Sequence, residues 1–505
     1  MAYKNNRSSP EYLNNNRSFS KKPKFFSSSS RSNSYNRNRN QFGLCSTCNK
    51  PNTHSDWCQH CNSENFRKKF KHWSSGNELI DNFIKDFQLS AINNRQVIEW
   101  IPYDQFRSFK FIARGGFAKV YSAVWKDGFI KKWDHEKGDW ERMSNWKVAL
   151  KTMENSSNLS LKFFDEIKAC VRCGGGFGLI RCYGISQEPD TGDYIIVLYY
   201  AHRGNLRSYL EQHYGELDWI QKLGILKQIA EGLNKIHQAG LVHRDFHSGN
   251  ILQGKNAEIA DLGFTGPVDK KSTSECNRKV YGVLPYVSPE VLRGRNYTPA
   301  SDIYSFGIIM WEISECIPPF SDRAHDGLLA LDICRGLRPT IEACMPKPFF
   351  KLINRCWDAS AKKRPSAQEL YETFHKWYWD LKDGTENEIT LAFNAADHDD
   401  SQLSSPVSSR PVTVTHPLAI YTSRILDFAD LPEPVNAPFK RLSISITSSI
   451  DTIVEEEYVT RQFEEDLVYD TESETTVTAV TFIPEEKNDD YITRQFDTDL
   501  PWEGS

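Results

Sequence analysis

The sequence lacks any apolar run of the roughly 18 to 20 residues that a membrane-spanning helix needs. Its best apolar stretch, YIIVLYYA at 194–201, predicts a buried strand instead. The first residues also lack the apolar centre of a secretory signal. We therefore predict no membrane partner, and we expect the 12 cysteines to be reduced thiols or metal ligands rather than disulfides. These absences predict a cytoplasmic protein, with nuclear import through KKPK (21–24) as the alternative.

Each end of the 505-residue chain has little charge of one sign. Residues 1–40 carry nine Lys or Arg against one Glu, whereas residues 384–505 carry 25 Asp or Glu against seven Lys or Arg. Both ends also lack the apolar periodicity that would offset the entropy of ordering. We predict a disordered basic Asn/Ser/Arg-rich tail over 1–41 and an acidic, mostly disordered tail over 381–505. The region between is rich enough in Trp, Phe, Leu and Ile to form a large core.

A turn that resembles a phosphate-binding loop is short of glycine. The stretch FIARGGFAKVYSAVWKDG (111–128) predicts a strand, a turn and a second strand. Ala113 and Ala118 stand where such a loop usually carries glycine, and only Gly115 and Gly116 remain. Glycine lets the backbone approach a phosphate closely, and alanine is the smallest departure from it. The turn alone is a weak signal of nucleotide binding.

Further polar groups follow at ordered spacings downstream. KVALK (147–151) predicts a short strand that carries Lys151, and LKFFDEIKACVRC (161–173) predicts an amphipathic helix that carries Glu166. GLVHRDFHSGNIL (240–252) and EIADLGF (258–264) then place two aspartates and an asparagine on turns after apolar strands.

This order of elements resembles the eukaryotic protein kinases over residues 105–380. VALK, HRDFHSGN, DLG and SPE occur here in the order of that family. The chain is most similar to tyrosine-kinase-like kinases of a large fungal expansion, which often join a short cysteine segment and a WIPYDQF-type lead-in (here Trp100 to Phe106) to the catalytic domain. The resemblance implies an α+β bilobal fold with a small β-rich N-lobe and a larger helical C-lobe. We expect a small zinc-ribbon-like element at 42–75 and a lead-in helix and linker at 76–104.

The resemblance also implies a role for each polar group. Lys151 would bind the α- and β-phosphates of ATP, held by an ion pair with Glu166, and Asp261 and Asn250 would hold Mg²⁺. Asp245 would orient the substrate hydroxyl and accept its proton. Ile112, Val120 and Ala149 would form the apolar walls around the adenine. The backbone of Tyr199 and Ala201 would form the hinge contacts, and Gly115 and Gly116 would approach the phosphates.

The predicted function is ATP-dependent transfer of phosphate to protein substrates. His247 and Val283 replace the Lys and Thr that are usual in Ser/Thr kinases, yet no tyrosine-specific signature is present. We favour Ser/Thr acceptors, with dual specificity as the alternative. A second function remains open, that of a pseudokinase scaffold that recruits partners through its cysteine segment and C-terminal tail. The resemblance also implies that Glu290 pairs with Arg364 and that Asp302 holds the backbone of the loop that carries Asp245.

The cysteines of CSTCNKPNTHSDWCQHC (45–61) have metal-ligand spacing. Cys45, Cys48, Cys58 and Cys61 form two C-x2-C pairs that suit a closed, structural Zn²⁺ site. His54 and His60 are alternative ligands. Cys170 and Cys173 share the spacing but lie on the predicted helix without a second pair, so we expect them to pack in the core. Although the N-terminal tail is basic, its basic patch is small and the chain has a net charge of −4, so we do not expect nucleic-acid binding.

The acidic tail contains a repeated motif. YTSRILD at 421, YVTRQFE at 458 and YITRQFD at 491 share the pattern Tyr-x-Ser/Thr-Arg-x-apolar-acid. We interpret these copies as short docking motifs for partners of the C-terminal tail. Their Ser or Thr beside Arg could also be phosphorylated by the kinase domain of the same chain, and relics of duplication are the remaining alternative.

Overall fold

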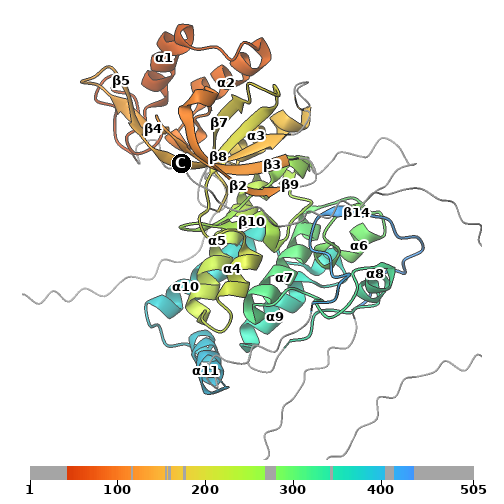
Figure 1. The fold of residues 1–505 in the computed structure, drawn as a ribbon. Coiled ribbons are helices and arrows are strands. Elements are labelled where there is room, and N and C mark those ends of the chain that lie inside the picture. Colours follow the sequence, from red (N-terminus) through yellow and green to blue (C-terminus); the bar gives the residue numbers. More distant parts are fainter. Residues whose placement is uncertain are drawn as a thin grey trace, which may run out of the picture. The chain divides into compact units, whose positions relative to one another are not determined.

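The structure, a computed structural model, describes residues 42–114, 118–153, 156, 161–173, 178–267, 280–341, 345–403 and 415–436. The predicted α+β architecture is confirmed, with a sheet-rich N-lobe and a helical C-lobe (Figure 1). The basic tail at 1–41, Gly115, Gly116 and the motif copies at 458 and 491 lie outside the described residues. Within the described part of the chain, no helix combines the length and the apolar character needed to cross a bilayer.

The N-lobe is built on a six-stranded sheet in the order β1-β7-β8-β6-β3-β2. The strands are Glu99–Trp100 (β1), Phe106–Arg114 (β2), Ala118–Trp125 (β3), Trp146–Met153 (β6), Cys182–Gln187 (β7) and Tyr194–Tyr199 (β8). Strand β1 comes from the lead-in and runs parallel to β7, whereas the other neighbours are antiparallel. Gly184 permits this pairing, because a Cβ on it would lie 2.0 Å from the carbonyl oxygen of Glu99.

Alternation along β6 determines which way Lys151 points. Val148 and Leu150 are buried in the sheet's apolar cluster with Trp125. Because successive side chains of a strand point to opposite faces, Ala149 and Lys151 lie on the other face. The predicted strand at 147–151 therefore directs its lysine away from that cluster.

Residues 42–104, called here the N-terminal extension, pack onto the N-lobe. Their helices are Gln59–Lys69 (α1), Phe70–His72 (η1), Glu78–Ser90 (α2), Asn94–Gln96 (η2) and Tyr103–Gln105 (η3). Helix α2 begins after Asn77, whose side chain accepts a hydrogen bond from the Leu79 amide. Its apolar stripe buries Ile80 and Ile84 completely.

A hairpin joins the N-terminal extension to the sheet. It consists of Phe129–Asp134 (β4) and Asp139–Met143 (β5), which pair antiparallel. Trp140 stacks on Phe66 and on Trp57, with ring centroids 4.4 and 5.9 Å apart. Arg142 donates to Glu99 of β1 at 2.8 Å. The hairpin thus binds the chain's own cysteine-bearing element.

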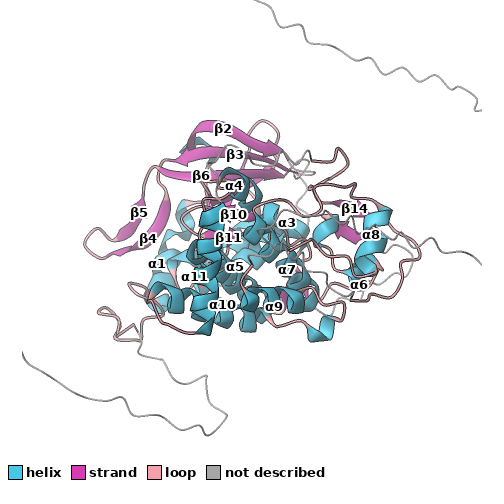
Figure 2. Cartoon of the chain, turned by 90° about the horizontal axis from the view of Figure 1, so that it is seen from below, coloured by secondary structure: helices cyan, strands magenta, loops and turns pink. Residues whose placement is uncertain are grey.

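The C-lobe is helical around a large apolar core (Figure 2). Its helices are Leu206–Gln212 (α4), Trp219–Gln238 (α5), Pro289–Leu292 (α6), Pro299–Glu315 (α7), Gly327–Cys334 (α8), Lys347–Cys356 (α9), Ala367–Lys382 (α10) and Glu388–Leu403 (α11), with short turns at Ser248–Asn250 (η4), Leu262–Phe264 (η5), Leu284–Tyr286 (η6) and Ala361–Lys363 (η7). Its short strands are Leu241–Val242 (β9), Ile251–Gln253 (β10), Ala257–Ile259 (β11), Gly266–Pro267 (β12), Val280–Gly282 (β13) and Arg424–Leu426 (β14). Capping boxes begin α5 at Asp218 and α7 at Thr298.

Two parts of the acidic region 381–505 are ordered against the C-lobe. Helix α11 buries Phe393 against Trp219 and Trp377. Residues 415–436, called here the C-terminal segment, run beside α6 and α8, and their strand β14 pairs antiparallel with β13 (Figure 1). Both parts lie in the stretch for which composition predicts mostly disorder.

Candidate active site

Lys151 lies at the centre of a buried ion-pair network. Its Nζ is 2.8 Å from Oε1 of Glu166 and 2.9 Å from Oδ1 of Asp261. Burial works against the charge of the ammonium, but the two carboxylates outweigh it and raise the pKa of Lys151. The group therefore remains a cation at any physiological pH.

Glu166 is positioned by the packing of Leu161–Arg172 (α3), the helix that the sequence predicts at 161–173. Ile167 on the same helix is fully buried, and Phe164 packs on Phe83 of α2 with ring centroids 4.8 Å apart. A Cβ on Gly263 would lie 3.1 Å from Oε2 of Glu166, so the turn after Asp261 fits closely under the carboxylate. The N-terminal extension therefore packs directly on the helix that presents Glu166.

The loop that carries Asp245 and Asn250 is held by Asp302 of α7, as the family resemblance implies. Oδ2 of Asp302 accepts from the His243 amide at 2.8 Å, and Oδ1 accepts from the Arg244 amide at 3.1 Å. Arg244 has a φ of 72°, a left-handed conformation that is uncommon outside glycine and is maintained by this contact. The predicted pair of Glu290 with Arg364 is also present, with two bonds of 2.7 and 2.8 Å.

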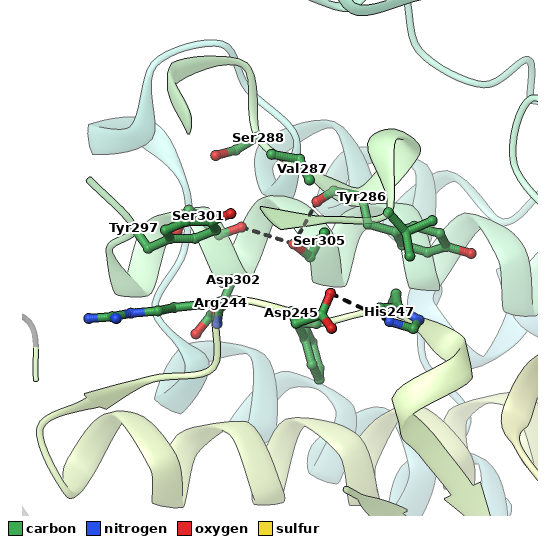
Figure 3. Close-up of a pocket in the computed structure, with 13 residues that line it drawn as sticks. Arg244, Asp245, His247, Tyr286, Val287, Ser288, Tyr297, Ser301, Asp302 and Ser305 are labelled. Atoms are coloured by element: carbon green, nitrogen blue, oxygen red, sulfur yellow. Dashed lines mark hydrogen bonds and ion pairs between the residues drawn. The ribbon is translucent and has the colours of Figure 1, made fainter. Parts of the chain in front are cut away.

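Asp245 and Asn250 meet on this loop. Nδ2 of Asn250 donates to the backbone oxygen of Asp245 at 2.9 Å and to its Oδ2 at 3.3 Å. Figure 3 shows Asp245 beside His247, across a cavity of about 10 Å³ from Tyr286. Nε2 of His247 lies 3.6 Å from Oδ1 of Asp245. Burial favours the neutral acid, but the hydrogen bonds from His247 and Ser423 lower the pKa of Asp245. The carboxylate is thus ionised and able to accept a proton.

Asp261 is the third acidic group of the site, after Glu166 and Asp245. Its backbone has a φ of 57°, in the left-handed region, and it precedes the turn η5. Burial would raise the pKa of Asp261, but the ammonium of Lys151 outweighs burial and lowers it. The ionised carboxylate and the amide oxygen of Asn250 are the oxygen ligands that Mg²⁺ prefers.

Three of the residues expected to surround a nucleotide share one face of the sheet. Val120 of β3 pairs directly with Lys151, and Ala149 lies two residues before it, so all three share a face. Ile112 lies on β2 and is half-exposed. Tyr199 ends β8, where its amide donates to the Arg181 carbonyl at 2.9 Å, and Ala201 follows two residues later. Gly115 and Gly116 are outside the described residues, so their place in the site stays a prediction.

The four cysteines of the N-terminal extension converge. The ligand atoms of Cys45, Cys48, Cys58 and Cys61 lie within 4.8 Å of one another, with sulfur pairs 3.8 and 3.6 Å apart. Tetrahedral zinc with bonds of about 2.3 Å requires sulfurs about 3.8 Å apart. In the absence of a metal, burial raises the pKa of the Cys58 and Cys61 thiols, whereas backbone hydrogen bonds from Cys48 and Thr47 outweigh burial and lower the pKa of Cys45 to about 6. The cluster could hold a metal ion.

The other C-x2-C pair behaves as expected. Cys170 and Cys173 are buried in the main apolar core. Burial raises the pKa of Cys173 to about 11, so its thiol is protonated. The structure brings neither close to the four-cysteine cluster among the described residues.

Ser423 is a site residue that the sequence marks only by the repeated motif. Its hydroxyl donates to both carboxylate oxygens of Asp245, at 2.7 and 2.9 Å. Nε2 of His247 is 3.1 Å from the same hydroxyl oxygen. The motif signals a serine beside an arginine, but nothing in it specifies where in the fold the segment binds.

Comparison with known proteins fits this geometry. The family model for protein tyrosine and serine/threonine kinases matches residues 106–374. A protein named as a serine/threonine-protein kinase/receptor of Acanthamoeba polyphaga mimivirus is 29% identical over 295 residues, which cover 57% of this chain and 17% of that protein. Two Dictyostelium discoideum proteins also match. One, named as a serine/threonine-protein kinase, is 32% identical over 54% of this chain and 18% of its own length.

The second Dictyostelium discoideum protein, named as a LIM domain-containing serine/threonine-protein kinase, is 34% identical over 34% of this chain and 26% of its own length. The chain therefore spans about a quarter or less of the length of these three relatives. Its placement in the tyrosine-kinase-like group stays a prediction. Because the kinase family model covers more than half of its residues, the chain belongs to the family of protein tyrosine and serine/threonine kinases.

Proposed function

We propose that this chain is an ATP-dependent protein kinase that phosphorylates serine and threonine hydroxyls. One observation carries the proposal. An ionised Asp245 accepts a hydrogen bond from a serine hydroxyl, while Lys151, Glu166 and Asp261 form a complete ion-pair network nearby. Phosphoryl transfer depends mainly on positioning and charge neutralisation, and these groups supply both.

Each residue has a role in this proposal. Asp245 orients the acceptor and takes its proton, a contribution of typically about 10²–10⁴-fold in rate. Lys151, held by Glu166, binds the non-transferred phosphates of ATP. Asp261 and the amide oxygen of Asn250 would hold Mg²⁺, which would neutralise phosphate charge. Val120 and Ala149 form part of the apolar wall beside the adenine.

The pseudokinase alternative rests on Ala113, Ala118 and His247. The two alanines lie in β2 and β3, in strand backbone that alanine adopts without strain. His247 contacts the same hydroxyl as Asp245, so it can help to hold the acceptor for transfer. We expect weaker ATP binding from the missing glycines, without loss of the transfer step.

The preference for serine and threonine has two supports. The three relatives described above are all named as serine/threonine-protein kinases. The hydroxyl that reaches Asp245 here is that of a serine. Dual specificity is the alternative that phosphoamino-acid analysis would separate.

We also propose that the four-cysteine cluster holds one structural Zn²⁺. Four thiolates leave no open coordination position, so the ion would stabilise the N-terminal extension and take no part in transfer. Metal analysis of the purified chain should find about one zinc per molecule, and Cys48→Ser should reduce it. Equal zinc content in both proteins would contradict this assignment.

The proposed activity is tested with the full chain, Mg²⁺ and labelled ATP. A generic basic acceptor protein is added, and Asp245→Asn is the matched control because it preserves shape and removes the charge. We expect labelled phosphoserine and phosphothreonine with the wild type and a loss of at least about 100-fold with Asp245→Asn. Equal labelling by both proteins, or labelling only on tyrosine, would contradict the proposal.

A further inference from the structure

The hydroxyl of Ser423 is arranged as a reacting group. The Gly249 amide donates to Nδ1 of His247 at 3.1 Å, so Nδ1 is the acceptor and the neutral ring carries its proton on Nε2. Nε2 then donates to the Ser423 oxygen at 3.1 Å. The hydroxyl proton is left to point at Asp245, whose nearer oxygen is 2.7 Å away. This is the orientation that proton transfer to a general base requires.

We propose that the C-terminal segment is an intramolecular substrate, with Ser423 as its phosphoacceptor, and that the repeated motif is the acceptor sequence of this enzyme. The proposal rests on the kinase activity proposed above and goes beyond it by naming the acceptor and the residues that select it. Before transfer, the segment occupies the acceptor site and keeps other substrates out.

Contacts on both sides of Ser423 hold the segment in one register. Two residues before it, the Tyr421 ring lies 4.6 Å from the guanidinium of Arg207, and its hydroxyl donates to the Pro319 carbonyl at 2.9 Å. Directly after it, Arg424 donates to the backbone oxygen of His325. Because Tyr421 and Arg424 lie on either side of Ser423 along the chain, the serine cannot shift its register without breaking these contacts.

Strand pairing fixes the residues that follow. In β14, Arg424, Ile425 and Leu426 pair with Gly282, Tyr281 and Val280 of β13. Leu426 is only 3% exposed, whereas Ile425 on the opposite face is 57% exposed. Because β13 ends at Gly282, which lines the cavity beside Asp245 together with Val283, pairing with β13 places Ser423 at that carboxylate.

The repeat matches this pattern of burial. The positions of Tyr421, Ser423, Arg424 and Leu426 contact the lobe, and the other two copies keep Tyr, Thr, Arg and Phe there. Of the three exposed positions, Thr422 and Ile425 change in character, to Val or Ile and to Gln, whereas Asp427 stays acidic. Because all four contacting positions keep a similar side chain, the three copies fit a shared binding mode. Thr460 and Thr493 take the place of Ser423 in the other copies.

The proposed step transfers one phosphoryl group from ATP to Ser423. The Ser423 oxygen forms a bond to the γ-phosphorus of ATP, and the bond from that phosphorus to the β–γ bridging oxygen breaks. ADP leaves with the electron pair, and the hydroxyl proton passes to Asp245 and then to solvent. The products are phosphoserine, ADP and a proton, with no further reactant needed.

The product is expected to leave the site. A phosphate adds about −1.5 to −2 charges, and it would lie beside the carboxylate of Asp245. Two negative charges in direct contact repel strongly in a buried environment. Phosphorylation of Ser423 therefore opens the acceptor site to the other motif copies and to separate substrates.

The test follows Ser423 in the full chain. Dephosphorylated wild type receives Mg²⁺ and ATP, the reaction is stopped within the first turnover, and peptides are analysed by mass spectrometry. A generic basic acceptor is assayed in parallel. We expect Ser423 to be modified first. Leu426→Thr should slow this by about tenfold or more, because it removes the buried anchor, while the matched exposed change Ile425→Thr stays within about twofold.

Three outcomes overturn the inference. Phosphate on the generic acceptor with Ser423 unmodified would make the segment a permanent inhibitor instead of a substrate. Equal effects of Leu426→Thr and Ile425→Thr would show that the observed register is not used. If neither Ser423 nor the generic acceptor is modified, the kinase activity itself fails, and this result is distinguishable from the first two.

Synthetic peptides test the acceptor sequence separately. Peptides spanning 418–430, 455–467 and 488–500 are added to the Leu426→Thr chain, in which the site is expected to be free. We expect phosphate on Ser423, Thr460 and Thr493, and a loss of at least about tenfold when the Arg after the acceptor or the Tyr before it is replaced by Ala. Phosphorylation unaffected by both replacements would overturn the proposed motif.

Discussion

The N-terminal extension and the C-terminal segment both pack onto the kinase domain, but by opposite means. The extension buries aromatic and aliphatic side chains: Trp57 and Phe66 are 2% exposed, and Ile80 and Ile84 are fully buried. In the C-terminal segment, Leu426 is the one large apolar side chain that is buried to this degree, while Leu418 and Val435 are more than half exposed. The rest of the segment is held by the partly buried side chains of Tyr421, Phe428 and Leu431 and by backbone hydrogen bonds, such as those from His325 to Leu418 and from His416 to Ser321.

This difference separates a structural part from a ligand. Apolar burial contributes about 25 cal/mol per Å² and is lost only on unfolding, so the extension is part of the domain. A backbone hydrogen bond exchanged with water contributes a net of only about 0.5–1.5 kcal/mol. A segment with one fully buried apolar side chain, held otherwise by half-buried side chains and such bonds, can bind and leave while the domain stays folded. Four predictions sharpen the contrast.

The largest effect should come from Trp57→Ala. The indole is buried against Trp140, and its N–H donates to the Ala91 carbonyl at 2.9 Å. We expect the free energy of unfolding to fall by about 3–5 kcal/mol. The matched change Leu418→Ala in the C-terminal segment should stay within about 0.5 kcal/mol. Chemical denaturation of both variants checks this, and similar losses would erase the contrast.

The second effect concerns Glu258 of β11, which faces Arg95 of the extension at 3.8 Å. Burial raises the pKa of Glu258 to about 7, although Arg95 and Arg181 oppose the shift. The folded state therefore binds more protons than the unfolded state between about pH 4.5 and 7, and stability falls as pH rises through that window.

Replacing Glu258 by Gln should remove this slope. We expect Glu258→Gln to be more stable than the wild type at pH 8, by up to about 3 kcal/mol, with a much smaller difference at pH 5. Urea unfolding at the two pH values measures it. A gain that is the same at both pH values would show that Glu258 does not titrate as described.

The third effect follows removal of the C-terminal segment. A chain that ends at residue 414 loses a competitor tethered at high effective concentration, so KM for an added peptide should fall by about tenfold. Its melting temperature should change little, because the segment contributes few core residues. Initial rates and thermal unfolding test both parts, and a large loss of stability with unchanged KM would reverse the roles of the two regions.

The smallest effect should come from Glu433→Gln. Glu433 pairs with Arg293 at 2.6 Å, but its side chain is 75% exposed. Exposed ion pairs contribute about 0–1 kcal/mol, so the rate of Ser423 phosphorylation should change by less than about twofold. Arg293 also donates to the Leu431 carbonyl at 3.0 Å, which the substitution leaves in place. A tenfold loss would show that charge, rather than strand register, anchors the segment.

The sequence predicts much of the site because its parts are local. VALK makes a short strand whose alternation directs Lys151, and the helix with Glu166 has a clear apolar stripe. Glu290 and Arg364 are 74 residues apart, and their pairing was expected only through the family resemblance. The fold class followed from the order of these motifs.

The parts that sequence reasoning missed depend on tertiary contacts. The parallel pairing of β1 with β7 requires Gly184 to meet Glu99, which no local pattern marks. Acidic composition predicts disorder near α11, where Phe393 packs against Trp219 and Trp377. The repeat marks Ser423 as one of several candidates, and only the pairing of β14 with β13 selects it.

The most direct test of the account measures how the phosphorylation of Ser423 depends on protein concentration. Dephosphorylated full-length chain is diluted over about a 100-fold range at fixed ATP, and the half-time for modification of Ser423 is recorded. An acceptor already 2.7 Å from Asp245 in the same molecule predicts one half-time at every concentration. A half-time that lengthens in proportion to dilution would show that Ser423 is phosphorylated between molecules and would contradict the account.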